Sequence, residues 1–258
     1  MSGALVDVRL ETRAGGCVAH VTVDNRAKLN TLNSALMLEF IAVVEGLAAR
    51  GDLRALVLSG AGDKAFIGGA SIVEMAGLDQ AAARDFITLV HRTCDALRRL
   101  PVPVIARIDG YALGAGLEVA VSCDLRVATR RAKFGMPETK VGIPSVVEAA
   151  LIPTLVGYGR ARELLMLGEI IDADTALRWG LIERVVEPVA LDAEVEKIVS
   201  ALFVAGAQAV RNQKALMQQW EKLPTDAAIA AGIEAFARAY ETDEPKRMLS
   251  TFAKRKRD

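Results

Sequence analysis

Strand-like segments alternate with helical segments through the first part of the chain, and from about residue 146 onward almost all of the sequence has helical spacing. Such alternation is typical of an α/β core, and a later run of helices indicates an added helical part. We therefore expect an α/β core over residues 1–200 and a helical region over residues 201–258. With 258 residues, 52% of them hydrophobic, the chain is long enough to bury one large core.

The expected strands are short and apolar, and they lie at residues 18–23, 53–59, 102–108 and 124–128. Two helices have clear limits in the same part of the chain. Asn33 or Ser34 can cap the first of them, and the second extends over residues 79–100 until Pro101 ends it.

The overall charge is balanced, with 32 Lys and Arg residues against 32 Asp and Glu residues. The whole molecule therefore has no electrostatic bias toward nucleic acid or membrane, and we expect neither as a partner. Residues 254–257, with the sequence KRKR, are strongly basic, which fits either a solvated chain end or a local contact with an anion.

Cys17, Cys94 and Cys123 are far apart and lack the spacing of a metal site, which favours buried free thiols in a reducing compartment. The chain does not begin with a basic segment followed by an apolar one, so we expect no secretory signal. No segment approaches the roughly 18 apolar residues that a membrane span needs. These features predict a cytoplasmic protein.

His20 and His91 are the only histidines, and nothing in the sequence pairs either with a nucleophile or a metal site, so a structural role is expected for both. No glycine-rich nucleotide-binding sequence follows a strand. Ser145, directly after Pro144, is interpreted as a helix N-cap rather than a nucleophile.

Three stretches carry residues suited to chemistry. The loop in residues 64–71, KAFIGGAS, lets the backbone approach a ligand, although a tight turn is an alternative. In residues 110–118, small residues precede a solitary Glu118 in an apolar run, where a carboxylate is either paired or has a raised pKa. Small residues at a helix start also leave N–H groups open to an oxyanion. Glu138 lies among apolar and turn residues, where a surface turn is the simpler interpretation.

Together these stretches resemble the enoyl-CoA hydratase/isomerase (crotonase) superfamily. Residues 64–75 (KAFIGGASIVEM) and 109–124 (DGYALGAGLEVAVSCD) are similar to its two oxyanion loops. Residues 134–144 (FGMPETKVGIP) are similar to its catalytic-glutamate segment, and weaker similarity continues to Phe252. The resemblance implies a spiral of ββα units with a C-terminal helical trimerisation region.

The resemblance also implies roles for single residues. Glu118 and Glu138 match the acid/base pair that adds one water across the α,β double bond of a 2-enoyl-CoA thioester. The backbone N–H groups of Gly68 and Ala115 would form the oxyanion hole for the thioester oxygen, where each donor typically contributes about 10²–10³ in rate. The substrate's coenzyme A would contact Arg26, Lys28, Gly69, Ala70, Ser71 and Ile72.

No metal or redox cofactor is implied, because coenzyme A enters as part of the substrate. The same resemblance implies a homo-oligomer, either a trimer or a hexamer.

Residues 145–151, SVVEAAL, replace a run that is glycine-rich in the family. Bulky Val146 and Val147 near Glu138 should reshape the acyl end of the pocket, so we expect a shorter or differently shaped acyl group. Ser71 stands where relatives often have Asp, and the turn that contains Lys28 is one residue shorter than a common family form.

Hydration is the favoured activity because both glutamate positions are occupied. A Δ3,Δ2-enoyl-CoA isomerase, or a lyase, hydrolase or decarboxylase of CoA thioesters, would reuse the same oxyanion hole. RNA binding or scaffolding through residues 254–257 is an alternative of another class. Such binding would fall steeply with salt and would not depend on Glu118 or Glu138.

Overall fold

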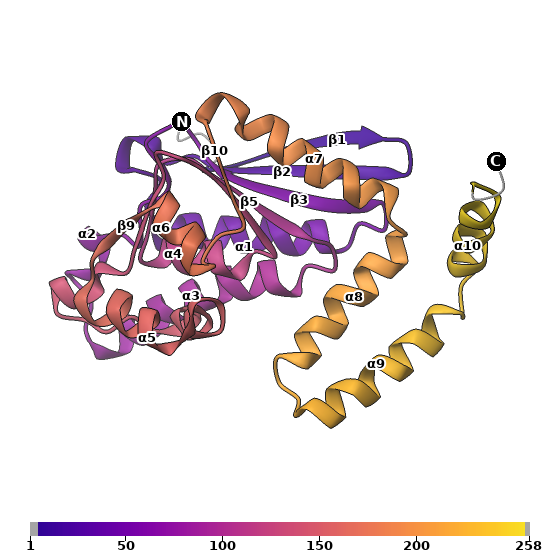
Figure 1. Cartoon of the computed structure of the whole chain (residues 1–258). Coiled ribbons are helices and arrows are strands. Elements are labelled where there is room, and N and C mark those ends of the chain that lie inside the picture. Colours follow the sequence, from indigo (N-terminus) through magenta and orange to yellow (C-terminus); the bar gives the residue numbers. More distant parts are fainter. Residues whose placement is uncertain (1–4, 256–258) are drawn as a thin grey trace.

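Two β-sheets organise the chain in the computed structural model, which describes residues 5–255 (Figure 1). The larger sheet contains, in spatial order, β1 (Val6–Arg13), β2 (Gly16–Val23), β3 (Leu53–Gly60), β5 (Val104–Ile108), β7 (Leu125–Thr129) and β10 (Arg184–Val186). The smaller sheet contains β4 (Ala65–Ile67), β6 (Tyr111–Leu113), β8 (Lys133–Gly135) and β9 (Ile170–Asp172).

The helices follow the strands in chain order. They are α1 (Ser34–Ala48), α2 (Ile72–Met75), α3 (Gln80–Arg99), α4 (Ala115–Ser122), α5 (Ile152–Leu167), α6 (Ala173–Trp179), α7 (Leu191–Val204), α8 (Ala207–Trp220), α9 (Thr225–Ala239) and α10 (Glu244–Arg255). Short 3₁₀ turns are η1 (Arg26–Lys28), η2 (Pro137–Val141), η3 (Val147–Leu151) and η4 (Pro188–Ala190).

One unit of two strands and a helical segment recurs along the chain. Strands β3, β5 and β7 pair in parallel in the larger sheet, and each is followed by a strand of the smaller sheet, where β4, β6 and β8 also pair in parallel. Helical segments then return the chain to the larger sheet. This arrangement is the expected spiral of ββα units.

The large sheet separates two apolar layers. One face packs with α1, α3, α4 and the smaller sheet in the main core, whereas the other face packs against α7. The helices near the main core begin where the sequence predicts. Asn33 Oδ1 accepts from Leu36 N at 2.9 Å, and Asp79 Oδ1 accepts from Ala82 N at 2.8 Å, so both side chains act as N-caps.

All four expected strands are present, but the sequence interpretation missed others. Strand β1, VDVRLETR, alternates apolar and polar residues, a strand pattern that the sequence interpretation overlooked, and it is a sheet edge whose only buried residue is Val6. Strands β9 and β10 lie in the region where only helices were expected, and that expectation was wrong. Each has three residues, and its pairing partner rather than its own pattern specifies it.

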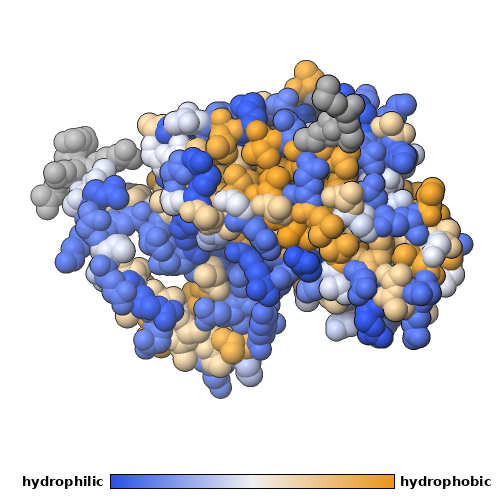
Figure 2. Space-filling view, turned by 180° about the vertical axis from the view of Figure 1, so that it is seen from behind, coloured by the Kyte–Doolittle hydropathy of each residue, from blue (hydrophilic) through white to orange (hydrophobic). Residues whose placement is uncertain are grey.

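Helices α8, α9 and α10, here called the C-terminal arm, lead away from the sheets (Figure 1). Figure 2 shows the molecule from behind, with a hollow between the arm and the body. Lys214 attaches α8 to the core, because its buried ammonium donates to Val102 O at 3.0 Å and to Asp124 Oδ2 at 2.7 Å. The proposed division at residue 200 falls inside α7, and it stays a prediction.

Cys17, Cys94 and Cys123 are buried free thiols, as expected. Within residues 5–255, no helix is long and apolar enough to cross a membrane. The basic residues 254–257 lie largely outside the described part, which includes the backbone of Lys254 and Arg255 but not their side chains.

Candidate active site

Glu118 lies in the first turn of α4 and is only 3% exposed. Its Oε1 accepts from Ala149 N at 3.3 Å. The pKa of Glu118 is raised to about 8, chiefly because burial disfavours the charged form and next because the carboxylate of Glu138 is close. The Ala149 amide opposes this shift, and Glu148 adds to it. Glu118 is therefore mostly protonated at neutral pH.

Glu138 lies in η2, half-buried, and faces the start of α4. A β-carbon placed on Gly114, the residue before α4, would stand only 2.5 Å from Glu138 Oε1. Gly114 also has a φ of +51°, so a larger residue there would strain the backbone and would displace the carboxylate. The structure thus brings the two predicted carboxylates to the same end of α4.

Ser145 holds the other oxygen of Glu138. Its Oγ donates to Glu138 Oε2 at 2.8 Å. The expectation that Ser145 caps a helix was wrong, because η3 begins at Val147 and no side chain caps it. The hydroxyl is turned toward Glu138 instead, a contact that the sequence pattern did not reveal.

His91 and Glu148 form a pair beside this site. His91 Nδ1 lies 2.8 Å from Glu148 Oε1, and Glu148 is 7% exposed. Its Oε2 is buried and has no hydrogen-bond partner among the groups that the structure describes. The contact fits the structural role expected of His91, since it ties η3 to α3. His20 pairs separately with Glu11, at 3.1 Å.

Of the two backbone amides predicted to form the oxyanion hole, only the amide of Ala115 has no acceptor among the described residues. Gly68 N donates to Leu29 O at 2.8 Å, so this amide is already occupied. Within residues 5–255, the amides of Ala70 and Ala115 have no acceptor. Leu32 N donates to the carbonyl of Gly69, and the amide of Ser71 donates to Leu32 O. Neither bond uses the amide of Ala70, which lies between them.

One free amide lies on the loop that follows β4, and the other is the first amide of α4. A β-carbon on Gly69 would stand 3.2 Å from Leu113 O, so the loop that carries Ala70 packs against the end of β6 just before Ala115. The first amide of a helix has no intrahelical acceptor, which explains why the Ala115 amide is available. We therefore replace Gly68 by Ala70 as the candidate donor and keep Ala115.

The comparisons with known proteins cover nearly the whole chain. The model of the enoyl-CoA hydratase/isomerase family matches residues 13–258. The chain belongs to the enoyl-CoA hydratase/isomerase family.

Named relatives of this family are similar to the chain in sequence, and solved structures of the family are similar to it in fold. A short-chain-enoyl-CoA hydratase of Clostridium acetobutylicum is 35% identical over 94% of this chain and 93% of its own length. A crotonyl-CoA hydratase of Syntrophomonas wolfei is 36% identical over 90% of both. The crystal structure of an enoyl-CoA hydratase from Mycobacterium smegmatis has a TM-score of 0.91, at 31% identity over 96% of both chains. These matches confirm the crotonase-like fold.

The residues expected to contact coenzyme A in this family lie in one region. The turn that contains Arg26 and Lys28 is bound to the Gly68 loop through Leu29 O, and Leu32 pairs with Gly69 and Ser71. Arg26 Nε donates to Asp24 Oδ1 at 2.8 Å, whereas Lys28 is exposed.

The loop of residues 68–71 leads into the short helix α2. Ser71 Oγ accepts from Glu74 N at 3.4 Å and so caps α2, and Ile72 is 64% exposed. The roles of all these residues toward coenzyme A stay predictions.

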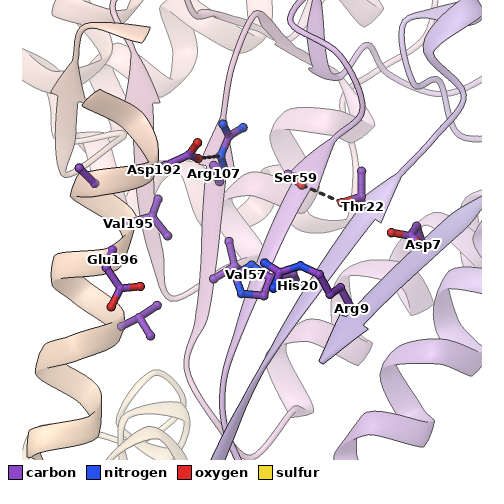
Figure 3. Close-up of a pocket in the computed structure, with 12 residues that line it drawn as sticks. Asp7, Arg9, His20, Thr22, Val57, Ser59, Arg107, Asp192, Val195 and Glu196 are labelled. Atoms are coloured by element: carbon purple, nitrogen blue, oxygen red, sulfur yellow. Dashed lines mark hydrogen bonds and ion pairs between the residues drawn. The ribbon is translucent and has the colours of Figure 1, made fainter. Parts of the chain in front are cut away.

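A polar cavity of about 580 Å³ lies away from this site, between the larger sheet and α7 (Figure 3). Its charged groups include an ion pair of Arg107 Nε with Asp192 Oδ1, at 2.6 Å, and Thr22 bonds Ser59 across its floor. Neither Glu118 nor Glu138 lines it. The sheet thus separates this cavity from the family's catalytic region.

Proposed function

We propose that this enzyme adds water across the α,β double bond of a 2-enoyl-CoA thioester. The observation that carries the proposal is the meeting of Glu118 and Glu138 at the start of α4, beside the free amides of Ala70 and Ala115. Similarity to relatives named as hydratases of short-chain enoyl-CoA and crotonyl-CoA supports it.

The amides supply the electrostatic part of the reaction. When the thioester oxygen accepts from Ala70 N and Ala115 N, the negative charge that develops on it in the enolate is stabilised. Both donors belong to the backbone, and their loops are held by Leu32 and Gly114, so little reorganisation accompanies the reaction.

The carboxylates supply the proton transfers. In the proposed reaction one carboxyl group is protonated and the other is ionised, and the pKa of Glu118, raised to about 8, favours Glu118 as the protonated one. The ionised carboxylate takes a proton from water as the water oxygen bonds to the β-carbon. The protonated carboxyl gives its proton to the α-carbon, and the pair ends with one proton, as it began. The balance needs neither metal nor redox cofactor.

The acyl group is proposed to be short. Val146 precedes η3 and Val147 begins it, so both lie between the residues that contact Glu138 and Glu118. Their bulk takes space that glycine would leave open. Turnover measured across enoyl-CoA thioesters of increasing chain length tests this, and equal efficiency throughout would refute it.

The ultraviolet absorbance of crotonyl-CoA with purified protein tests the activity itself. Loss of the conjugated thioester band is expected, with Glu118→Gln and Glu138→Gln each lowering the rate by about 10²–10⁴. Glu163→Gln, an exposed change on α5, is the matched control and should keep the wild-type rate. If the band persists, 3-enoyl thioesters test the isomerase instead. Loss of the band in all three variants alike would contradict the assigned residues.

We also propose that the enzyme is a homo-oligomer, a trimer or hexamer, assembled through the C-terminal arm, which would make residues 201–258 its assembly region. Helix α9 and its C-cap residue expose, at helical spacing, Ile229, Ile233, Phe236 and Tyr240, with exposed fractions between 43% and 69%. An apolar stripe of this kind is typical of an interaction surface.

The three buried free thiols are compatible with the reducing cytoplasm as the proposed location of the enzyme.

A further inference from the structure

Ser145 contacts only one of the two oxygens of Glu138. The hydroxyl donates to Oε2 at 2.8 Å, while Oε1 lies against Gly114 at the entrance of α4. A hydroxyl has one proton to donate, so this bond distinguishes the two oxygens. Oε2 is restrained, and Oε1 is the oxygen that lies against Gly114, the residue before α4.

The backbone that carries Ser145 is itself held at several points. Four residues later, Ala149 N donates to Glu118 Oε1 at 3.3 Å, and between them Glu148 binds His91 on α3 at 2.8 Å. The 145–149 segment thus contacts both carboxylates and is tied to a third element.

Val147, in the middle of this segment, has a φ of +40°. A β-branched residue in that region is strained, and the strain persists only where the surroundings over-determine the conformation. The flanking contacts of Ser145, Glu148 and Ala149 supply that constraint. The segment is therefore held in a conformation that aims the Ser145 hydroxyl at Glu138.

We propose that Ser145 is a positioning residue that holds Glu138 in one rotamer, with Oε1 directed at the start of α4 as the oxygen that exchanges the proton. The role of Oε1 in proton exchange rests on the proposed hydration. The restraint of the Glu138 rotamer by Ser145 does not depend on that reaction. Ser145 touches no reacting atom and acts through Glu138.

Steady-state kinetics of Ser145→Ala and Ser145→Thr with crotonyl-CoA test the proposal. A hydrogen bond to a charged group corresponds to about a tenfold or larger change in equilibrium, so Ser145→Ala should lower kcat about tenfold with KM within about twofold. Its pH–kcat profile should also move, because the pair loses a donor to its ionised form. Ser145→Thr keeps the hydroxyl and should restore most of the rate.

Two outcomes would overturn the proposal. One is wild-type kcat and pH profile in Ser145→Ala. The other is an equal loss in the alanine and threonine variants together with a lowered Tm, which indicates a merely structural residue.

Crystal structures of wild type and Ser145→Ala separate this inference from the proposed function, since they need no activity. We expect Glu138 to leave its place beside Gly114 when the hydroxyl is removed, and an unmoved carboxylate would overturn the inference. If the wild type hydrates no 2-enoyl thioester, the proposed function fails while the structures still decide on Ser145.

Discussion

Gly114 and Glu138 are in close contact, since a β-carbon on Gly114 would lie 2.5 Å from Glu138 Oε1 and the carboxylate would have to shift. Gly114 belongs to the loop that leads into α4, and Glu138 belongs to η2, 24 residues later. The absence of a side chain at Gly114 thus lets the carboxylate reach the residue that precedes α4.

Replacement of Gly114 by alanine should therefore displace Glu138. A misplacement of about 1 Å can cost about 10²-fold in rate, and we expect a loss of this size in kcat for Gly114→Ala. Gly62→Ala is the matched control, because Gly62 also has a positive φ, +80°, but no atom lies near its would-be β-carbon. Equal losses in the two variants would show that backbone strain alone explains the effect.

Glu118 should make the stability of the enzyme depend on pH. Its folded pKa, about 8, is above the ordinary value of 4.5, so the folded state binds the proton more tightly than the unfolded state does. The contribution of Glu118 to the free energy of unfolding is fully present below pH 4.5, and it is lost as the pH rises from 4.5 to about 8. Above that range the folded state carries a buried charge.

Urea unfolding of wild type and Glu118→Gln between pH 5 and pH 9 measures this effect. The variant, which cannot ionise, should gain stability relative to wild type as the pH rises, even though it has lost activity. Glu163→Gln should follow the wild-type curve. A constant difference between Glu118→Gln and wild type at every pH would contradict the raised pKa.

His91 should stabilise the fold through Glu148. His91→Ala would leave both oxygens of a buried carboxylate without a described partner, which costs about 1–3 kcal/mol in the free energy of unfolding. Asp85→Ala, an exposed change on the same helix, should cost much less. Urea denaturation compares them, and equal stabilities would show that the pair contributes nothing.

The apolar stripe of α9 should control assembly. Phe236→Asp places a charge at a residue that is 69% exposed, and we expect it to lower the molar mass measured by light scattering toward that of one chain. Arg238→Asp, on the opposite side of α9, is the control and should leave the mass unchanged. An unaltered oligomer in Phe236→Asp would exclude this stripe as the interface.

Much of the architecture could be predicted from local patterns. Asn33 and Asp79 cap their helices because a short polar side chain before an apolar helical stripe needs only its own first turn as partner. The solitary Glu118 in an apolar run predicts a carboxylate that is either paired or has a raised pKa, and the structure shows that it is buried and that its pKa is raised. The three motifs together indicated the family, which the comparisons then established.

What only the tertiary structure decided depends on partners from distant parts of the chain. Whether Gly68 or Ala70 keeps a free amide is determined by Leu29 and Leu32, which occupy the neighbouring groups of the loop. Whether Ser145 caps a helix or holds Glu138 depends on where η2 places the carboxylate. A hydrogen bond has one direction and a short range, so motifs determine which groups are present and only the packed chain determines which of them meet.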